Sequence, residues 1–403
     1  MIGIEASYAD RAGPPTGVGP ALLQWLTLRR DAMVAHLADL VRHETPSQEP
    51  ERLKPAFAGV AEQLRGLLFE VRVRPGRRAG GFLLARPAGL RRRAPIQLVL
   101  GHLDTVWPAG TLRRMPCVVE DGWVRGPGAY DAKGGVTQLV FALRALAAHS
   151  LTPQVAPVVL LGGDEEIGSP DSTPTVERLA RRADRALVLE PSLGPGGRLK
   201  TARKGVGRFT VTVHGKAAHA GLDPDAGASA ILELSHVVQA LFGLNDPARG
   251  VTVNVGQVDG GIGANVVAAV ATAAVDVRVP TAREGAHVAE ALRALRAVTP
   301  GTRVVVEGAF GRPPLVPTPT GRALWERARA HGRALGLDLA EGRAGGGSDG
   351  CTAGRWTATL DGLGPVGGGA HAAHERVAAD ALPARAALLA LLLLDSPLER
   401  GAR

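Results

Sequence analysis

The chain has 403 residues, of which 45% are hydrophobic and 21% charged; these proportions exclude a disordered chain and are typical of a globular protein. One hydrophobic core rarely serves more than about 300 residues, so we expect two domains. The formal net charge is +9 and aromatic residues make up only 3%. Because the arginines are scattered and have no aromatic residues interleaved with them, the charge favours a solvated surface over a nucleic-acid interface.

The first half of the chain alternates between helical and strand-like patterns. Apolar residues at helical spacing predict helices over residues 20–42 and 136–148. Short apolar runs predict strands at residues 69–73, 82–84, 96–100, 155–161 and 186–189. This alternation predicts an α/β domain with a doubly wound, mostly parallel sheet.

The pattern changes after Lys204. A strand, a helix, two strands, a helix and a strand are predicted in turn at residues 209–213, 226–241, 251–255, 268–279, 286–298 and 302–307. This β-α-β-β-α-β order is that of a ferredoxin-like domain. A proline-rich linker over residues 312–320 then leads to a helix, a strand and a last helix. We therefore predict a first domain of residues 1–204 and 313–403, interrupted by an inserted domain of residues 205–312.

Cysteine usage and the chain ends predict a soluble, cytoplasmic protein. Neither Cys117 nor Cys351 belongs to a CxxC pair, and one possible bridge is no disulfide framework. Residues 1–19 contain no apolar signal core. The apolar run at residues 386–394 is well below the ~20 residues that a membrane-spanning helix needs, so we expect a helix that packs in the core.

Acidic and histidine side chains gather where predicted strands end. His102 follows one strand, Glu165 and Glu166 follow another, and Glu190 follows a third, while Asp131 precedes the helix at residues 136–148. The carboxyl ends of strands form the ligand-binding edge of an open α/β sheet, so these side chains are expected along one rim. Carboxylates crowded together would repel without a cation, and imidazole and carboxylate ligands suit zinc or a related divalent ion.

Five motifs carry a resemblance to a known family. They are Gly101-His102-x-Asp104-Thr105-Val106, Asp131-x-Lys133-Gly134-Gly135, Asp164-Glu165-Glu166-x-Gly168-Ser169, Glu190-Pro191 and Gly215-Lys216-Ala217-Ala218-His219-Ala220-Gly221. With them the chain resembles the two-zinc hydrolases of the acetylornithine deacetylase, succinyl-diaminopimelate desuccinylase and glutamate carboxypeptidase family, and looks most like glutamate carboxypeptidase. The resemblance covers about residues 20–395 and includes the inserted domain, which it implies to be a dimerisation and lid domain.

The resemblance implies a site for two divalent metal ions, with Zn²⁺ preferred and Co²⁺ or Mn²⁺ as alternatives. Asp131 would bridge the two ions, and His102 and Glu190 would complete one of them. Glu166 and a late histidine would complete the other. Three carboxylate ligands together with one hydroxide would balance the charge of two divalent cations.

The late histidine is expected to be His371, because Glu375 follows it four residues later as in the family pattern. His374 is the alternative.

The same resemblance implies three catalytic side chains. Glu165 would act as general base on the attacking water and then protonate the leaving amine. Asp104 would accept the second imidazole N–H of His102 and so orient its ring. His219 on the inserted domain would steady the oxyanion, often in the partner subunit, which implies a homodimer.

Further positions match residues that hold a substrate's carboxylates in the family. Asn265 and Arg278 would hold the terminal carboxylate. Residues that could hold a side-chain carboxylate are Arg198, Lys200, Arg312 and Ser348. These matches favour an acidic released residue.

The sequence therefore predicts a zinc-dependent metallocarboxypeptidase or amidohydrolase that releases a carboxylate-bearing, acidic C-terminal amino acid from a small peptide. An N-acyl-amino-acid amidohydrolase, acting on N-acyl amino acids, is the alternative within the enzyme class. A metal-binding protein without catalysis is the alternative outside it. No nucleic-acid or membrane partner is expected.

Overall fold

The computed structural model describes residues 17–398. Residues 1–16, most of the segment expected to lack a signal core, lie outside the described residues, as do residues 399–403. The chain forms two compact units: unit 1 is Met1–Thr201, Pro317–Gly342 and Ser348–Arg403, and unit 2 is Ala202–Val316 and Arg343–Gly347. Unit 2 contains all of the predicted insertion and a short later segment that the sequence did not suggest.

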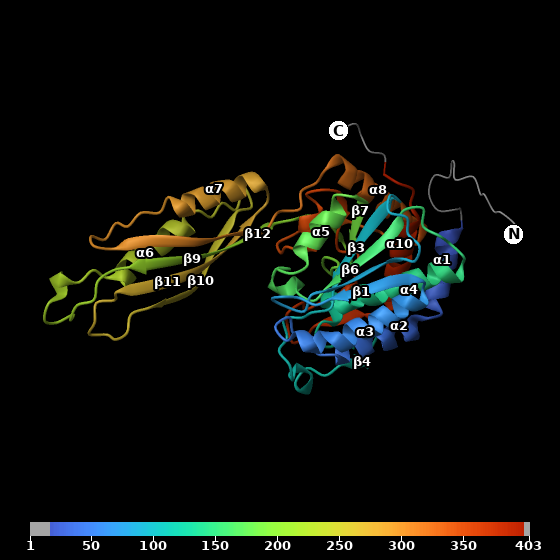
Figure 1. The fold of residues 1–403 in the computed structure, drawn as a ribbon, viewed down its shortest axis with the longest axis horizontal. Coiled ribbons are helices and arrows are strands. Elements are labelled where there is room, and N and C mark those ends of the chain that lie inside the picture. The colour runs from blue at the N-terminus through green and yellow to red at the C-terminus, as the bar shows by residue number, and fades with distance from the viewer. Residues whose placement is uncertain (1–16, 399–403) are drawn as a thin grey trace. The chain divides into compact units, whose positions relative to one another are not determined.

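Unit 1 is built on a six-stranded sheet with the order β1-β2-β6-β3-β7-β14 (Figure 1). The strands are β1 Phe69–Arg74, β2 Phe82–Pro87, β3 Ile96–His102, β6 Ala156–Gly162, β7 Ala183–Val188 and β14 Ala358–Leu360. Strands β6, β3, β7 and β14 run parallel, while at one edge β2 pairs antiparallel with β6 and β1 pairs antiparallel with β2. The predicted doubly wound, mostly parallel sheet is confirmed.

Alternation along the buried strands divides the core of unit 1 between the two faces of the sheet. In β3, Val99 belongs to one core cluster while Leu98 and Leu100 belong to another, because successive side chains of a strand point to opposite faces. The helices of unit 1 are α1 Val18–Thr27, α2 Arg30–Arg42, α3 Pro50–Gly66, α4 Gly134–Ala148, α5 Thr173–Ala180, α8 Pro319–Ala334, α9 Asp349–Ala353 and α10 Leu382–Leu394. Helices α4 and α10 pack side by side on the face of the sheet to which Val99 points, and α5 covers the opposite face, to which Leu98 and Leu100 point (Figure 1).

The helices near the N-terminus differ from the prediction. The single helix expected over residues 20–42 is wrong, because two helices, α1 and α2, form with a break at Leu28 and Arg29. Both helices pack on α4 and α10, but α1 lies mainly on α10, whereas α2 also packs on the segment that carries Asp131. Helix α3 was not predicted, although Leu53, Phe57, Val60 and Leu64 recur at helical spacing and are buried.

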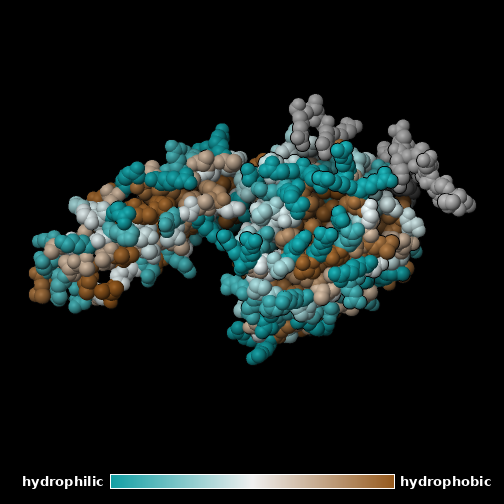
Figure 2. All heavy atoms as spheres, viewed as in Figure 1, coloured by the Kyte–Doolittle hydropathy of each residue, from teal (hydrophilic) through white to brown (hydrophobic). Residues whose placement is uncertain are grey.

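Helix α10 is the apolar helix expected near the C-terminus, and its side chains are almost all buried in unit 1. Among residues 17–398, the structure contains no helix with both the length and the apolar character needed to cross a bilayer. Hydrophilic side chains cover much of the face of unit 1 drawn in Figure 2.

A small sheet of unit 1 joins an early segment of the chain to a late one. Its order is β15-β16-β5-β4, from β4 Val118–Glu120, β5 Trp123–Arg125, β15 Gly367–Gly368 and β16 Arg376–Ala378. Pairing of β16 with β5 places the segment between β15 and β16 beside the loop that precedes α4. A separate two-stranded sheet is formed by β8 Leu199–Arg203 and β13 Glu341–Ala344.

Unit 2 has one antiparallel sheet with the order β10-β11-β9-β12. Its elements, in chain order, are β9 Gly205–His214, α6 Ala230–Phe242, β10 Thr252–Gly260, β11 Val270–Val279, α7 Ala282–Arg293 and β12 Arg303–Arg312. Alternate residues of the strands, such as Val211, Val213, Val275 and Val277, pack with both helices in one core. This is the predicted ferredoxin-like order.

Candidate active site

The candidate ligands lie at the carboxyl ends of the parallel strands of unit 1, as predicted. His102 is the last residue of β3, Glu165 and Glu166 form the short turn η3 (Glu165–Ile167) after β6, and Glu190 follows β7. Asp131 lies in another short segment, η2 (Ala129–Lys133), directly before α4.

Two glycines explain how Asp131 comes so close to the strand ends. A Cβ on Gly135 would lie 2.1 Å from the carbonyl oxygen of Leu189, and one on Gly134 would lie 2.7 Å from Pro365. Any side chain at either position would collide with its neighbours. The glycine pair therefore allows the start of α4 to press against the end of β7, next to Glu190.

Asp131 is shared between two histidines. Its Oδ1 lies 3.2 Å from Nε2 of His102, and its Oδ2 lies 3.5 Å from Nε2 of His371. A further carboxylate accompanies each histidine: Oε1 of Glu190 lies 3.4 Å from His102, and Oε2 of Glu166 lies 3.1 Å from His371. The five predicted ligands thus form two groups of three that have Asp131 in common.

His371, rather than His374, faces these carboxylates. His371 has a φ of 60°, a left-handed backbone conformation that is uncommon outside glycine and recurs at functional sites. The ring of His374 instead lies beside Gly369, where a Cβ on the glycine would come within 2.9 Å of its Cδ2.

Electrostatics tie the histidines to the carboxylates. Burial alone would lower the pKa of His102, but three neighbouring carboxylates, first that of Asp104, hold this pKa well above its ordinary value. The hydrogen bond to Glu166 raises the pKa of His371, and burial raises the pKa of Glu166. Positive charge beside these buried carboxylates therefore stabilises their ionised form.

The donor set fits divalent cations. Two imidazole nitrogens and three carboxylates converge, and no cysteine takes part, which suits zinc and related ions. The ligand atoms of His102, Asp131 and Glu166 lie within 4.8 Å of one another, as do those of His102, Glu165 and Glu190. The site can therefore hold metal ions, and the second group includes Glu165, to which the sequence assigns proton transfer.

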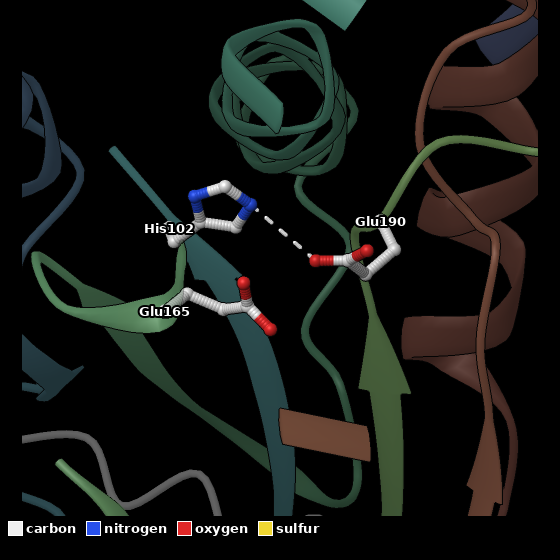
Figure 3. A group of neighbouring side chains, drawn as sticks. All are labelled: His102, Glu165 and Glu190. Carbon is white, nitrogen blue, oxygen red and sulfur yellow. Dashed lines mark ion pairs between the residues drawn. The ribbon is translucent and has the colours of Figure 1, made fainter. Parts of the chain in front are cut away.

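Glu165 extends from its turn toward His102 and Glu190 (Figure 3). The three side chains come from three different strand ends and meet in one space, where the dashed line marks the 3.4 Å pair of His102 with Glu190. The carboxylate of Glu165 thus lies beside two of the candidate metal ligands.

Asp104 is fully buried and holds several parts of the site together. Its Oδ1 lies 3.4 Å from Nδ1 of His102, and its two oxygens accept the backbone N–H groups of Glu165 and Glu166, each at 3.1 Å. Ser47, which the sequence analysis missed, donates its hydroxyl to Asp104 at 2.7 Å. The contact depends on a bridge between Pro46 and Thr105, for which the sequence offers no local signal.

In unit 2, the structure brings His219 and Asn265 together. Val266 forms an isolated bridge with His219, and Ala220 donates its N–H to the carbonyl of Asn265 at 2.9 Å. Nδ1 of His219 accepts the N–H groups of Gly221 and Leu222, both at 3.1 Å.

Arg278 lies at the other end of the sheet of unit 2, near the end of β11. Its guanidinium already makes two hydrogen bonds to Asp276, at 2.6 and 2.9 Å. A substrate carboxylate at Arg278 would therefore compete with a carboxylate of the chain itself.

The other predicted substrate residues fall into different environments. In unit 1, Arg198 is exposed, Lys200 is buried, and Ser348 caps α9 by accepting the N–H of Gly350 while donating its hydroxyl to Asp361 at 2.6 Å. In unit 2, Arg312 is buried and packs along Gly347. The hydroxyl of Ser348 is thus occupied by contacts within the chain.

Comparison with known proteins agrees with this site. The family model of peptidase family M20/M25/M40 matches residues 98–395. Carboxypeptidase G2 of Pseudomonas sp. strain RS-16 is 30% identical over 93% of this chain and 91% of its own length. Acetylornithine deacetylase of Myxococcus xanthus is 35% identical over 43% of this chain and 47% of its own length. The solved structure of aminopeptidase PepT from Bacillus cereus has the same fold, with a TM-score of 0.73 at 20% identity over 91% of this chain and 98% of its own. The chain therefore belongs to peptidase family M20/M25/M40 and is a metal-dependent hydrolase.

Proposed function

We propose that the enzyme is a two-metal carboxypeptidase that hydrolyses the amide bond before a C-terminal amino acid. The observation that carries this proposal is the shared carboxylate of Asp131, with one oxygen toward His102 and the other toward His371. The similarity to carboxypeptidase G2 over nearly the whole chain supports the exopeptidase reaction. We propose zinc as the metal, because the donors are imidazoles and carboxylates.

In this proposal, His102, Asp131 and Glu190 would hold one ion, and Asp131, Glu166 and His371 would hold the other. Bound there, two divalent cations would polarise the scissile carbonyl and acidify a water molecule. Glu165 takes the proton of that water as the oxygen adds to the carbonyl carbon, and it gives the proton to the nitrogen as the C–N bond breaks. Asp104 holds Glu165 for this task through the backbone N–H.

His219 is suited to stabilise the oxyanion. Because Nδ1 accepts two backbone N–H groups, the neutral ring carries its proton on Nε2 and presents that N–H outward. A fixed N–H donor is what a developing oxyanion requires.

We further propose that the enzyme acts as a homodimer. His219 and Asn265 lie beyond the end of β11 that pairs with His214, whereas Arg278 lies near the other end. The eight residue steps from Val270 to Arg278 span about 27 Å, which is longer than a dipeptide, so one substrate cannot contact both ends of the same unit 2. Two copies of the chain would resolve this by contributing different ends to each active site.

The surface of unit 2 also favours a second copy. Val258 is 64% exposed and Ile262 91% exposed, and half-exposed Ile231 lies against Gly260 and Gly261 between them. Apolar side chains appear on the face of unit 2 drawn in Figure 2. Exposed apolar residues that lie together are typical of contact surfaces.

For the substrate, we propose a small peptide with an acidic C-terminal residue. Arg198 and Lys200 supply positive charge in unit 1, and Arg312 supplies it in unit 2. The deacetylase relative favours a second candidate, an N-acyl-amino-acid amidohydrolase. A cytoplasmic location is part of the proposal, and two cysteines that lie in no CxxC pair, Cys117 and Cys351, are consistent with it.

A substrate panel tests the proposal. Zn²⁺-loaded enzyme would be assayed with dipeptides ending in glutamate, aspartate, leucine or lysine, and with N-acetyl amino acids. We expect kcat/KM to be at least about tenfold higher for the acidic dipeptides, because an acidic side chain can form charge-assisted hydrogen bonds to the basic residues proposed to hold it, whereas leucine and lysine cannot. Preference for the N-acetyl amino acids would select the amidohydrolase, and no hydrolysis of any amide would refute both.

A further inference from the structure

Glu375 lies behind the candidate metal site, and its carboxylate collects an unusual number of N–H donors. Its Oε1 accepts the backbone N–H groups of Tyr130 and Asp131 at 2.9 and 3.0 Å. Its Oε2 accepts the backbone N–H of Gly128 at 3.0 Å and the indole N–H of Trp107 at 3.1 Å. The side chain is 1% exposed, so these four bonds are its compensation for leaving water.

Three of the four donors belong to the loop that carries Asp131. Gly128 has a φ of 75°, and Asp131 departs from helical geometry within η2. A backbone of this kind does not satisfy its own N–H groups through helical hydrogen bonds. The carboxylate of Glu375 satisfies them from outside and thereby fixes the course of the loop.

The same residue is anchored to the segment that carries His371. Glu375 follows His371 by four residues, and its carbonyl accepts the N–H of Gly126 at 3.3 Å. Gly369, which precedes His371 and has a φ of 81°, allows this segment to fold closely onto Glu375, since a Cβ there would lie 2.9 Å from the Cα of Glu375. One residue therefore connects two segments that are 244 positions apart in the chain.

We propose that Glu375 is a positioning residue that fixes Asp131 relative to His371 and so sets the affinity of the metal site. The inference rests on the ligand set of the proposed function. A metal ion needs its ligands at nearly fixed separations, and these two reach the site from distant segments that this carboxylate links by hydrogen bonds. Partners that orient ligands without touching the metal commonly contribute 10- to 100-fold in metal affinity.

The test is the substitution Glu375→Gln in the full chain. The amide keeps the shape of the side chain but turns an NH₂ group toward N–H donors, so at least one pair of the four bonds is lost. We expect the more weakly held of two Zn²⁺ equivalents to bind at least about tenfold more weakly, as measured by calorimetric titration of metal-free protein with Zn²⁺ alone.

A matched control separates positioning from general stability. Glu233 is also 1% exposed, and its carboxylate accepts the backbone N–H groups of Val298 and Thr299, but it belongs to unit 2. Glu233→Gln should lower the melting temperature while both Zn²⁺ affinities stay within about twofold of wild type. A residue with a merely structural role would behave like this control.

The outcomes are distinct. Glu375→Gln protein that folds and binds two Zn²⁺ within twofold of the wild-type affinities would overturn the positioning role. Wild-type protein that binds no Zn²⁺ would instead overturn the ligand set itself. If Glu375→Gln does not fold, Trp107→Phe decides: loss of the single indole bond should weaken Zn²⁺ binding about threefold, and unchanged affinity would refute the inference.

Discussion

Glu165 and Glu166 are neighbours in the chain, yet their side chains serve different parts of the site. Glu166 contacts His371 at 3.1 Å, while Glu165 reaches toward His102 and Glu190. The short turn η3 directs the two side chains apart, and Asp104 fixes the turn by accepting both backbone N–H groups. Two identical residue types thus have different neighbours, and we assign them different chemistry.

Replacement of Glu165 tests that assignment. In Glu165→Ala, kcat/KM should fall by about 10²- to 10⁴-fold, because the side chain proposed to carry the proton from water to amine is removed. The metal content, measured by elemental analysis, should remain two per chain.

Two other outcomes would contradict this assignment. Loss of one metal equivalent would make Glu165 a ligand, which its place in the group with His102 and Glu190 allows. Turnover within a few-fold of wild type would remove Glu165 from the reaction. Glu326→Ala, on the surface of α8, is the control and should change neither quantity.

At the scale of elements, the contact between α4 and β7 decides where Asp131 lies. In Gly135→Ala, the new methyl group would meet the carbonyl oxygen of Leu189 at 2.1 Å. We expect a loss of stability of about 1–3 kcal/mol in urea unfolding, together with weaker Zn²⁺ binding, because the start of α4 must move away from β7.

Gly59→Ala in α3 is the matched control, since a Cβ at Gly59 meets no atom within 4 Å. This helical position should gain up to about 1 kcal/mol from the better helix propensity of alanine. Zn²⁺ binding should not change. Equal behaviour of the two variants would contradict a specific role for the close approach at Gly135.

The contact between α2 and α4 predicts a pH dependence of stability. Nδ1 of His36 lies 2.9 Å from the hydroxyl of Thr137. Burial, with a smaller contribution from Arg144, lowers the pKa of His36 from 6.5 to about 4, although the hydrogen bond with Gln63 and the charge of Asp39 act in the opposite direction. The ring is then neutral in the folded chain where it would be protonated in the unfolded chain.

The folded protein therefore becomes less stable as the pH falls. As the pH falls from 6.5 toward 4, the unfolded chain binds the proton first, so folding loses on the order of 3 kcal/mol from this group. His36→Gln cannot titrate and should lose less stability than wild type between pH 7 and pH 4.5 in urea unfolding. His287→Gln, on the exposed side of α7, should follow wild type. Parallel curves for wild type and His36→Gln would contradict the prediction.

At the scale of the whole molecule, the proposed homodimer predicts complementation. Glu165→Ala damages unit 1 and His219→Ala damages unit 2, so each variant alone should be almost inactive. If each site combines unit 1 of one chain with His219 of the other, a heterodimer has one doubly damaged site and one intact site. Co-expressed and purified through two different tags, it should recover about half of the wild-type activity per dimer. A heterodimer as inactive as its parents would show that each site uses one chain only.

The sequence by itself determined the parts of this protein that depend on local patterns. Apolar runs such as β3 and β6 predict buried strands, and the charged residues directly after them must lie at the carboxyl edge of the sheet. Short motifs fix the spacing within Gly101–Asp104 and Asp164–Glu166, because neighbouring residues remain neighbours in any fold. The ferredoxin-like order of unit 2 follows from the same periodicity.

Only the tertiary structure decided what depends on contacts between distant segments. His371, rather than His374, is the candidate ligand because the turn beside Gly369 directs the ring of His371 toward Glu166. The break between α1 and α2 accompanies different tertiary contacts, since α1 packs mainly on α10 and α2 on the segment that carries Asp131. The carboxylate of Glu375 finds its four donors only once β16 pairs with β5. Such contacts leave no mark in local periodicity, because they are fixed when remote parts of the chain pack together.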